Sequence, residues 1–408
     1  MSSRIRSLAP SERLFAMGGA YVGYSVRVRG ELDIAALSTA FAALRRRYPV
    51  LAASLAADDD GFAIIARSGP LPGVVVSAGE VDGAISIVGA DQRRALAALH
   101  INHDDDRASV TLLTHHSIAD ACHSYALLAD LWSLYTDAVH GEPLDTTPWG
   151  YPKSLETLLA ERGIVRAAQP PAAPVAPSRP LDAIRRFAVA RARCRLSEDA
   201  TSALLEFARR HESTLNSVIS AAILRVETES RDLPAERIHY SYPVNLRDRL
   251  SPPVAAQAAT DPLGHANFTP ATDVTDIVEL AKTITAQLVD DLRTGEIHRA
   301  GLDFFDRTMT AAGVGQVPES ERRVMVLSSN WGIVPPLRAP ERLRFDDFRS
   351  MLPEATADTA PNAYFLTTFQ GRLSIELRSP FDTATVRQHV AAIEAILSAL
   401  IDVDVAAP

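Results

Sequence analysis

The spacing of hydrophobic residues along the chain predicts strands and helices that follow one another in alternation. Residues 21–29 alternate between apolar and polar positions with a period of two, which predicts a half-buried strand. Asp33 then stands at a helix N-cap position, and apolar residues recur every three or four positions over residues 34–48, which predicts an amphipathic helix. Because both periods return later in the chain, we expect an α/β fold.

A predicted hairpin lies in the middle of the first half of the chain. Residues 99–103 and 109–114 are apolar runs separated by the polar turn 104–107, and a helix is predicted directly after them at 121–139. The other predicted elements are short strands within 51–88, a strand at 188–196, a helix opened by Ser197–Asp199, a helix at 215–227, strands at 238–244, 323–327, 363–369 and 372–377, and a last helix at 384–400.

Chain length and one biased segment predict two domains. A chain of 408 residues exceeds the usual size of a single core. The segment 166–182 is rich in proline and alanine, a composition typical of an extended connection. We therefore predict an N-terminal domain at 1–165, a crossover linker at 166–182 and a C-terminal domain at 183–408, each a layered α/β domain with mixed sheets, with an active site between the two.

Composition and charge exclude several classes of protein. The 47% of hydrophobic residues provide for a packed core, and the net charge of −9 disfavours a nucleic-acid surface. Two cysteines, Cys122 and Cys194, build no disulfide framework and fit a reducing compartment. The sequence shows no apolar signal core near its start and no uninterrupted apolar stretch of about 18 residues, so we expect a cytoplasmic protein without a membrane span.

The segment Thr114–Asp120 (THHSIAD) is the strongest candidate for chemistry. It follows a predicted strand, and catalytic side chains gather where a rigid strand gives way to an open loop. His116 is the candidate general base, with His115 in support. Asp120 could orient an imidazole or anchor the loop through an arginine, and the second role is favoured because a carboxylate at a helix start suits capping. Zinc binding by these residues together with His123 is the disfavoured alternative.

The spacing His-His-x-x-x-Asp resembles the signature of the acyltransferase superfamily that includes plant alcohol acyltransferases, condensation domains of peptide synthetases and chloramphenicol acetyltransferase. Further segments look like the polyketide-associated acyltransferases, typified by the phthiocerol/phthiodiolone dimycocerosyl transferases. These segments are Tyr48–Leu51 (YPVL), 135–139 (YTDAV), 159–164 (LAERGI), Leu215–Asn216, 242–247 (YPVNLR) and 261–264 (DPLG), and the similarity runs along nearly the whole chain.

The resemblance implies two chloramphenicol-acetyltransferase-like domains with an active-site channel between them. It assigns His116 as catalytic and Asp120 as structural. Arg247 follows an apolar strand and is either a solvated charge or the partner of Asp120. The plant branch carries a late Asp-Phe-Gly-Trp-Gly loop, for which this chain has only Ser328–Gly332 (SSNWG), where Asn330 could donate to a tetrahedral oxyanion.

The resemblance also implies transfer of an acyl group from a thioester to an alcohol, with no acyl-enzyme and no bound cofactor. The donor is acyl-coenzyme A or an acyl carrier protein, and the net negative charge leans toward a short acyl-coenzyme A, such as acetyl, acting on a polyketide alcohol. One alternative is transfer of long branched acyl chains to a phthiocerol-type diol lipid. An alternative of another class is a condensation-type or inactive module that binds acyl carriers. We expect a monomer.

Overall fold

The computed structural model describes residues 3–59, 61–67, 69–79, 81, 90–166, 189–271, 275–313, 324–351 and 361–405, and these fold into three sheets and the helices that cover them. The chain forms a mixed α/β fold, as predicted. All of the predicted linker at 166–182 except Arg166 lies outside the described residues.

The chain divides into two compact units that are not contiguous in sequence. Unit 1 comprises Met1–Val165, Leu246–Pro262 and Pro335–Pro353, and unit 2 comprises Arg166–Asn245, Leu263–Val334 and Glu354–Pro408. The predicted C-terminal domain at 183–408 is corrected in this respect, because two of its segments pack with residues 1–165. One of these segments adds a strand to the sheet of unit 1, and the other supplies a buried arginine to the motif described below.

The main sheet of unit 1 has the strand order β12-β2-β7-β6-β5. Its strands are β2 (Tyr21–Gly30), β5 (Val75–Ala78), β6 (Ala97–His103), β7 (Arg107–His115) and β12 (Leu343–Met351). The predicted strand at 21–29 and the predicted hairpin are confirmed: β2 and β6 both pair antiparallel with β7, and Tyr21 pairs with His115. The end of β7 that carries the histidine motif is therefore held from both sides.

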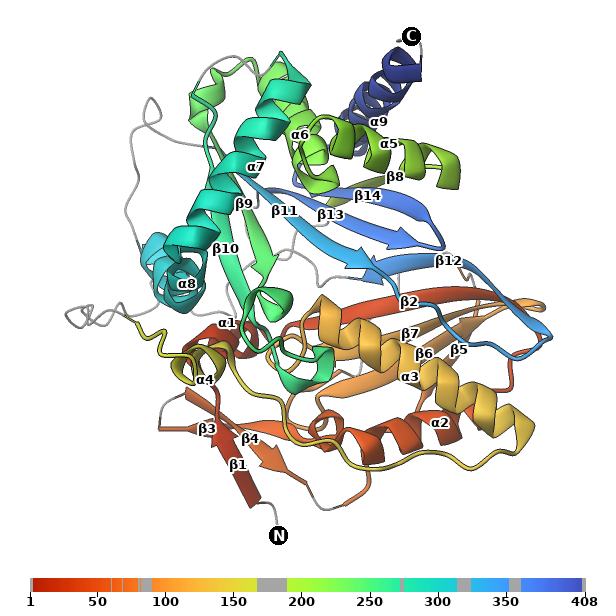
Figure 1. The fold of residues 1–408 in the computed structure, drawn as a ribbon. Helices are drawn as coiled ribbons and strands as arrows, with labels where there is room; N and C mark the ends of the chain where they lie inside the picture. The colour runs from red at the N-terminus through yellow and green to blue at the C-terminus, as the bar shows by residue number, and fades with distance from the viewer. Residues whose placement is uncertain are drawn as a thin grey trace. The chain divides into compact units, whose positions relative to one another are not determined.

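Two predicted helices, α2 (Ile34–Arg47) and α3 (Ala121–His140), lie side by side along one face of this sheet (Figure 1). Asp33 caps α2, because its carboxylate accepts the backbone N–H of Ala36 at 2.9 Å. The apolar face of each helix is buried, through Leu37, Ala40, Phe41 and Leu44 in α2 and Leu127, Leu128, Leu131 and Leu134 in α3. Burial of one such large side chain stabilises the fold by about 1.5–3 kcal/mol. Burial of these faces therefore contributes more to the stability of the two helices than the helix propensity of individual residues does.

A smaller sheet of unit 1 has the order β1-β4-β3, made of β1 (Ser3–Ser7), β3 (Ser54–Asp58) and β4 (Gly61–Ala66). Helices α1 (Pro10–Gly18) and α4 (Leu155–Ala160) contact each other in the same unit. Of these five elements, only the strands β3 and β4 fall in a region where strands were predicted. Helix α1 matters for function, since it carries a ring that stacks on the motif.

Unit 2 is built on a six-stranded mixed sheet of order β10-β9-β11-β13-β14-β8. Its strands are β8 (Ala190–Arg195), β9 (Ile238–Asn245), β10 (Leu263–Phe268), β11 (Val324–Ile333), β13 (Asn362–Phe369) and β14 (Arg372–Ser379). Strand β11 runs parallel to β9 and β13, and the other pairs are antiparallel. The predicted loop Ser328–Gly332 is wrong, because backbone pairing of Ser328, Ser329 and Asn330 with β13 continues β11 through this segment.

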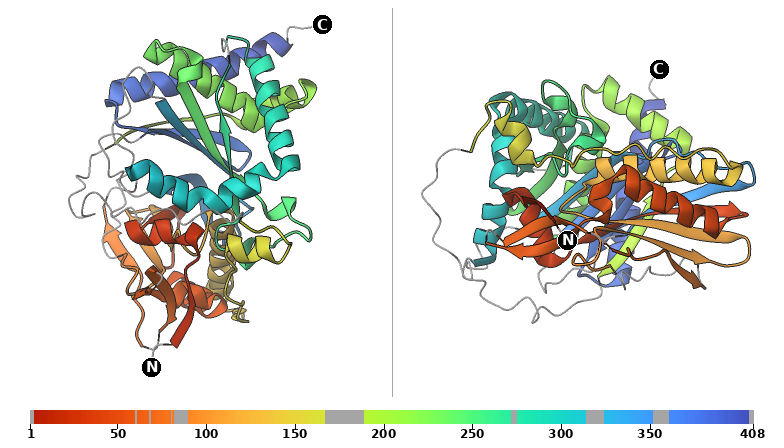
Figure 2. Two further views of the ribbon diagram at one scale, coloured as in Figure 1. Left: turned by 90° about the vertical axis from the view of Figure 1, so that its left-hand side faces the viewer. Right: turned by 90° about the horizontal axis from the view of Figure 1, so that it is seen from below.

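Helices α5 (Glu198–Arg210), α6 (Leu215–Arg231) and α9 (Thr383–Val405) pack together on one face of this sheet (Figure 2). Helix α7 (Ile277–Thr294) lies against α6, and α8 (Glu296–Gly313) lies against β10. The first three were predicted from the sequence, α5 from the residues at its start, whereas α7 and α8 were not. All five belong to unit 2.

Helix α9 is, among the described helices, the one with the length and composition of a membrane-crossing helix. The segment Thr383–Asp402 has a mean hydropathy of 1.2. Val386, Val390, Ile393 and Leu397 are buried, and α9 packs against β8 and α6. One helix of this kind is weak evidence for a membrane span, because core helices meet the same criterion.

Candidate active site

The histidine motif begins where β7 ends, and backbone hydrogen bonds fix its position. The N–H of His115 donates to Leu96 O and the N–H of His116 donates to Ala20 O, each at 2.8 Å. The N–H of Ile118 then turns back to His115 O at 3.0 Å. The two histidines are therefore placed by the sheet rather than by a free loop, which is how a rigid element positions a reactive side chain.

The ring of His116 is held flat against Phe15 of α1. The two ring centroids lie 3.9 Å apart with an interplanar angle of 4°, and the His116 side chain is 24% exposed. Its Nδ1 is buried without a hydrogen-bond partner among the described residues and lies 4.0 Å from Oδ2 of Asp261. The stacking leaves little freedom of ring rotation, so both ring nitrogens have defined directions.

The pKa of His116 lies below its ordinary value because burial disfavours the imidazolium. The carbonyl of its own backbone and the negative charge of Asp120 act in the opposite direction. At neutral pH the ring is therefore uncharged, and one nitrogen carries a free lone pair. A neutral, partly exposed imidazole fits the role of a general base, as the sequence predicts.

His115 is completely buried and turned away from the reactive position. Its Nδ1 accepts the N–H of Ser117 at 3.3 Å, so its Nε2 carries the hydrogen and donates to Gln92 Oε1 at 2.8 Å. The ring also packs edge-on against the ring of Tyr21, with the two ring centroids 4.9 Å apart. Burial, followed by the neighbouring His116, lowers the pKa of His115 to about 3. These contacts suit the supporting role predicted for it.

Acidification below pH 6.5 is expected to destabilise unit 1. Burial lowers the pKa of His115 to about 3 and that of His123 to about 4, against 6.5 in an unfolded chain. The unfolded state binds these protons first, so stability present above pH 6.5 is lost as the pH falls toward these values. Between pH 6.5 and 5 each histidine removes about 1.5 kcal/mol from the free energy of unfolding.

Urea unfolding of a Trp331→Phe chain measures this effect, because Trp132 and Trp149 are then the only tryptophans and both belong to unit 1. We expect His115→Gln to reduce the pH dependence, because it removes one of the buried histidines of unit 1 whose pKa is lowered. His140→Gln is the matched control, since His140 is exposed at the end of α3. A pH dependence that His115→Gln leaves unchanged contradicts the assignment of a neutral, buried His115.

Asp120 forms a buried ion pair with Arg247. This is one of the two interpretations of Arg247 that the sequence left open. Nη1 of Arg247 lies 2.5 Å from Oδ2 of Asp120, Nη2 lies 2.9 Å from Oδ1, and both residues are 2% exposed. Oδ1 also accepts the N–H of His123 at 2.9 Å, which caps α3. Both oxygens of Asp120 thus bind groups other than the His116 ring, and its structural role stays a prediction.

The segment 246–262 is a loop whose two ends meet. Leu246 N–H donates to Pro262 O at 3.0 Å, the N–H of Asp120 donates to Thr260 O at 2.8 Å, and Thr260 is paired with the backbone of Lys153. This closed shape is typical of an Ω-loop, which often carries functional residues. The loop brings Arg247 and Asp261 to the motif from a distant part of the sequence.

Glu12 of α1 is the centre of a second buried polar cluster beside this loop. Its side chain accepts hydrogen bonds from both terminal nitrogens of Arg6, at 2.6 and 2.7 Å, and from Thr260 Oγ1 at 2.7 Å. Ser117 Oγ donates to the backbone carbonyl of Glu12 at 2.8 Å. The cluster ties α1, and with it the Phe15 ring, to the motif and the loop.

Phe15, Glu12 and Gln92 were not predicted as site residues, and Asp261 was noted only as part of the family-like segment 261–264, without a role. Each is defined by a contact with a motif that lies elsewhere in the sequence. Phe15 could have been suspected only from a helix prediction for residues 10–18, where Pro10 and Glu12 are typical of a helix start.

Asn330 lies in unit 2 on β11, and its side chain is engaged locally. Its Nδ2 donates to Asn216 Oδ1 at 3.1 Å, and its Oδ1 accepts the N–H of Gly332 at 2.9 Å. The predicted contact of Asn330 with a tetrahedral oxyanion stays a prediction.

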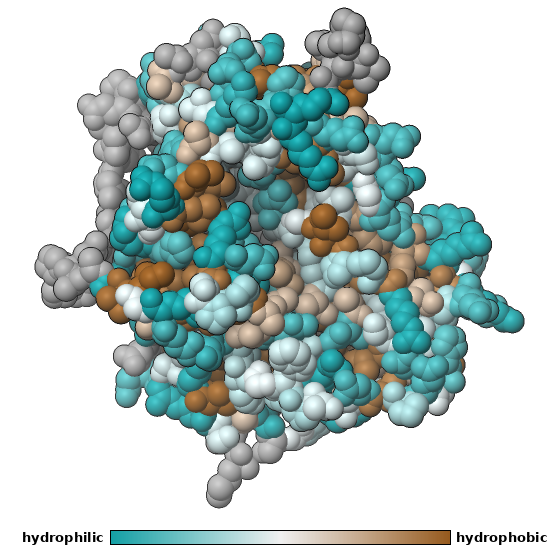
Figure 3. All heavy atoms as spheres, in the orientation of Figure 1, coloured by the Kyte–Doolittle hydropathy of each residue, from teal (hydrophilic) through white to brown (hydrophobic). Residues whose placement is uncertain are grey.

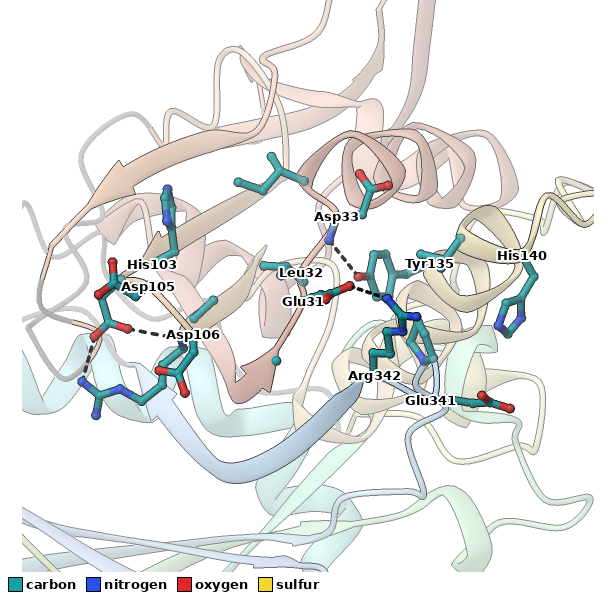
Figure 4. A pocket seen from close by; sticks show the side chains of 17 residues that line it. Glu31, Leu32, Asp33, His103, Asp105, Asp106, Tyr135, His140, Glu341 and Arg342 are labelled. Carbon is teal, nitrogen blue, oxygen red and sulfur yellow. Dashed lines mark hydrogen bonds and ion pairs between the residues drawn. The ribbon is translucent and has the colours of Figure 1, made fainter.

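Two cavities of unit 1 lie apart from His116. One, of about 760 Å³, is at the end of the main sheet, where hydrophilic residues gather on the surface (Figure 3). It is lined by Glu31, Arg342, His103 and the β6–β7 turn (Figure 4), but Glu31 pairs with Arg342, and Arg107 pairs with Asp104. The carboxylates of Glu31 and Asp104 in this cavity are therefore paired with arginines.

The second cavity, of about 940 Å³, borders the small sheet and is lined by three arginines, Arg4, Arg67 and Arg93, of which Arg4 is paired with Asp58. Gln92, the hydrogen-bond partner of His115, also lines it. Among the described residues, no three histidine, cysteine, aspartate or glutamate side chains are grouped to hold a metal ion.

Comparison with known proteins decides the family of the chain. Phthiocerol/phthiodiolone dimycocerosyl transferase of Mycobacterium ulcerans is 36% identical over 398 residues, which cover 91% of each chain. The counterpart of Mycobacterium leprae is 32% identical over 427 residues and covers 98% of this chain and 96% of its own. The chain belongs to the phthiocerol/phthiodiolone dimycocerosyl transferase family. A family model described as the C-terminus of these transferases also matches residues 185–378.

Solved structures agree with the family and with the wider fold. Polyketide synthase associated protein 5 from Mycobacterium tuberculosis superposes with a TM-score of 0.80 at 32% identity over 98% of both chains. The first condensation domain of the CDA synthetase has a TM-score of 0.69 at 15% identity over 98% of this chain and 97% of its own, and so shows the fold alone. The predicted resemblance is confirmed, and the chain is an acyltransferase.

Proposed function

We propose that the protein transfers an acyl group from a thioester to a hydroxyl group, with His116 as the general base. The hydroxyl proton passes to Nε2 of His116, because Nδ1 faces the buried Asp261. The hydroxyl oxygen then bonds to the thioester carbonyl carbon, and the tetrahedral intermediate collapses as the carbon–sulfur bond breaks. The proton passes from Nε2 to the departing thiolate, so the products are an ester and a free thiol.

The acceptor we propose is a diol lipid of the phthiocerol type, and the transferred group is a long branched acyl chain. The names of the family members favour this alternative over transfer of acetyl to a polyketide alcohol. The preference for a short acyl-coenzyme A rested on net charge, which says little about the local surface where a donor binds. The thioester carrier, coenzyme A or an acyl carrier protein, acts as a co-substrate, and no other cofactor takes part.

The observation that carries the proposal is the geometry of His116. Its ring is locked against Phe15 at the end of β7, uncharged and 24% exposed, while Asp120 is fully engaged by Arg247. A neutral base with a fixed direction accelerates proton transfer by about 100- to 10,000-fold. An inactive carrier-binding module requires no such base, whereas a condensation-type module shares the motif and differs in forming an amide instead of an ester.

Incubation of the protein with thioester donors and a phthiocerol-type diol tests the proposal by release of free thiol. We expect thiol release that depends on the acceptor and is faster with long branched acyl donors than with acetyl-coenzyme A. Since the base acts on a bound alcohol, both substrates bind before chemistry, so initial rates give intersecting lines. Intact mass after incubation with donor alone shows no acyl adduct.

Faster transfer of acetyl to a macrocyclic polyketide alcohol than of long acyl chains to the diol would contradict the proposed substrates. Parallel lines, together with an adduct that the acceptor discharges, would instead contradict the direct mechanism. A wild-type chain that releases no thiol with any hydroxyl acceptor but forms amides would favour the condensation-type function.

A further inference from the structure

A buried carboxyl group, that of Asp261, lies beside the ring of His116. Asp261 is 6% exposed, and its Oδ1 is buried without a hydrogen-bond partner among the described residues. Its Oδ2 lies 4.0 Å from Nδ1 of His116, whose ring also interacts with the carbonyl of its own backbone. Buried carboxylates are almost always hydrogen-bonded, so a buried carboxylate with an unpartnered oxygen beside this ring calls for a functional explanation.

Backbone contacts on either side hold Asp261 in place. Thr260 is bonded through its carbonyl to the N–H of Asp120 at 2.8 Å and through its N–H to Lys153 O at 2.9 Å. On the other side Pro262 accepts the N–H of Leu246 at 3.0 Å. The carboxylate therefore stays opposite Nδ1, and a small rotation of its side chain closes the gap.

Asp120 is not available for the same purpose. One of its oxygens binds Nη1 of Arg247, and the other binds both Nη2 of Arg247 and the N–H of His123. Asp261 has no cation within ion-pair distance among the described residues other than His116 once it is protonated. The free carboxylate near the catalytic ring is therefore Asp261.

The charged surroundings make Asp261 and His116 compete for one proton. Burial, and after it the negative charge of Asp120, raises the pKa of Asp261 well above its ordinary value, while burial lowers that of His116. The titratable and charged groups that face this pair from neighbouring elements are Asp120 and His123 of the α3 start, His115 of β7, Glu12 of α1, Glu156 of α4 and Arg247 of the loop.

We propose that Asp261 is a positioning residue for His116, which accepts a hydrogen bond from its Nδ1 and stabilises the imidazolium formed during acyl transfer. When Nε2 takes the hydroxyl proton, the positive charge on the ring draws Oδ2 of Asp261 onto Nδ1–H. When Nε2 gives that proton to the departing thiolate, the ring is neutral again and the contact relaxes. The inference rests on the proposed function for its catalytic consequence, but the coupling of the two groups is a property of the free protein.

A histidine titration by NMR of the full chain tests the coupling without any substrate. A ¹³Cε1-labelled His116, assigned by its loss in His116→Asn, reports the ring pKa directly. In Asp261→Asn we expect the pKa of His116 to fall by about half a unit or more, because the proposed contact of Nδ1 with Asp261, which favours the imidazolium, is lost. Asp261→Ser serves as a second variant if the first fails to fold.

Asp248→Asn is the matched control, because Asp248 lies on the same loop with an exposed side chain. It should leave the His116 titration unchanged. In the acyl-transfer assay, Asp261→Asn is expected to lower kcat by about 10- to 100-fold with KM within about threefold, and to move the acid limb of the pH profile to lower pH. Loss of rate without that movement indicates a purely structural role and overturns the proposal.

A His116 pKa that is the same in wild type and Asp261→Asn overturns the proposal even if acyl transfer is observed. A lowered pKa supports the coupling even if the protein acts on a different substrate. The two failures are therefore distinguishable, since the titration requires no turnover and the thiol-release assay requires no variant.

Discussion

Replacing His116 with alanine is expected to lower kcat for acyl transfer by about 100- to 10,000-fold, the range that a general base contributes. The structure offers no substitute at this position, because His115 is buried and both of its ring nitrogens are engaged by Gln92 and Ser117. The affinity for the two substrates should change little, because the lost interaction forms in the transition state, when the hydroxyl proton moves to His116, and not in the complex with the bound alcohol. The effect is therefore on kcat and not on KM.

Stability must be measured alongside the rate. Alanine removes the ring that stacks on Phe15, so His116→Asn, which keeps a polar group of similar reach, is the second variant. His140→Ala is the matched control, because this histidine is exposed at the end of α3. A folded His116→Ala protein that keeps more than about a tenth of the wild-type rate would remove His116 from the mechanism.

The motif residues were predictable because local sequence dictates their placement. An apolar strand, two histidines and an aspartate at a helix N-cap form one continuous segment, and Asp33 before α2 repeats the same capping chemistry. Asp261 carries no such signal. It stands beside a proline in an irregular loop, and its importance arises only when the loop 246–262 closes on itself.

Two of the strands that escaped prediction, β1 and β12, have a broken periodicity. Strand β12 pairs with β2, but its register shifts between Phe345 and Asp347, so apolar side chains no longer alternate along it. Strand β1 has the same kind of shift between Arg4 and Arg6. Since a bulge turns every later side chain to the other face, the period of two disappears although the strand remains.

The noncontiguous units have a related cause. The sequence places β12 late in the chain, where nothing local shows that it completes the sheet of the first half. Likewise, the apolar strand before Arg247 is equally compatible with a solvated charge and with a buried ion pair. The unit to which β12 belongs and the partner of Arg247 both depend on contacts between residues far apart in the sequence. A single sequence contains no direct signal of such contacts.

Asp120→Asn is expected to reduce the free energy of unfolding of unit 1 by about 3–5 kcal/mol, the usual cost of leaving one member of a buried ion pair without its partner. Asparagine retains an oxygen that can cap α3 through the N–H of His123, so the loss reports the uncompensated charge of Arg247 rather than the cap. Urea unfolding in the Trp331→Phe background measures it. The pH profile of acyl transfer should keep its shape, because Asp120 is turned to Arg247.

Asp33→Asn supplies the matched control for that loss. Asp33 is also an N-cap aspartate, but it is exposed and faces no buried cation, so its replacement should cost less than about 0.5 kcal/mol. The double variant Asp120→Asn/Arg247→Met removes both charges and should be less destabilised than the sum of the single variants by about 1–3 kcal/mol. Unchanged stability of Asp120→Asn together with a shifted pH profile would make Asp120, and not Asp261, the carboxylate that acts on His116.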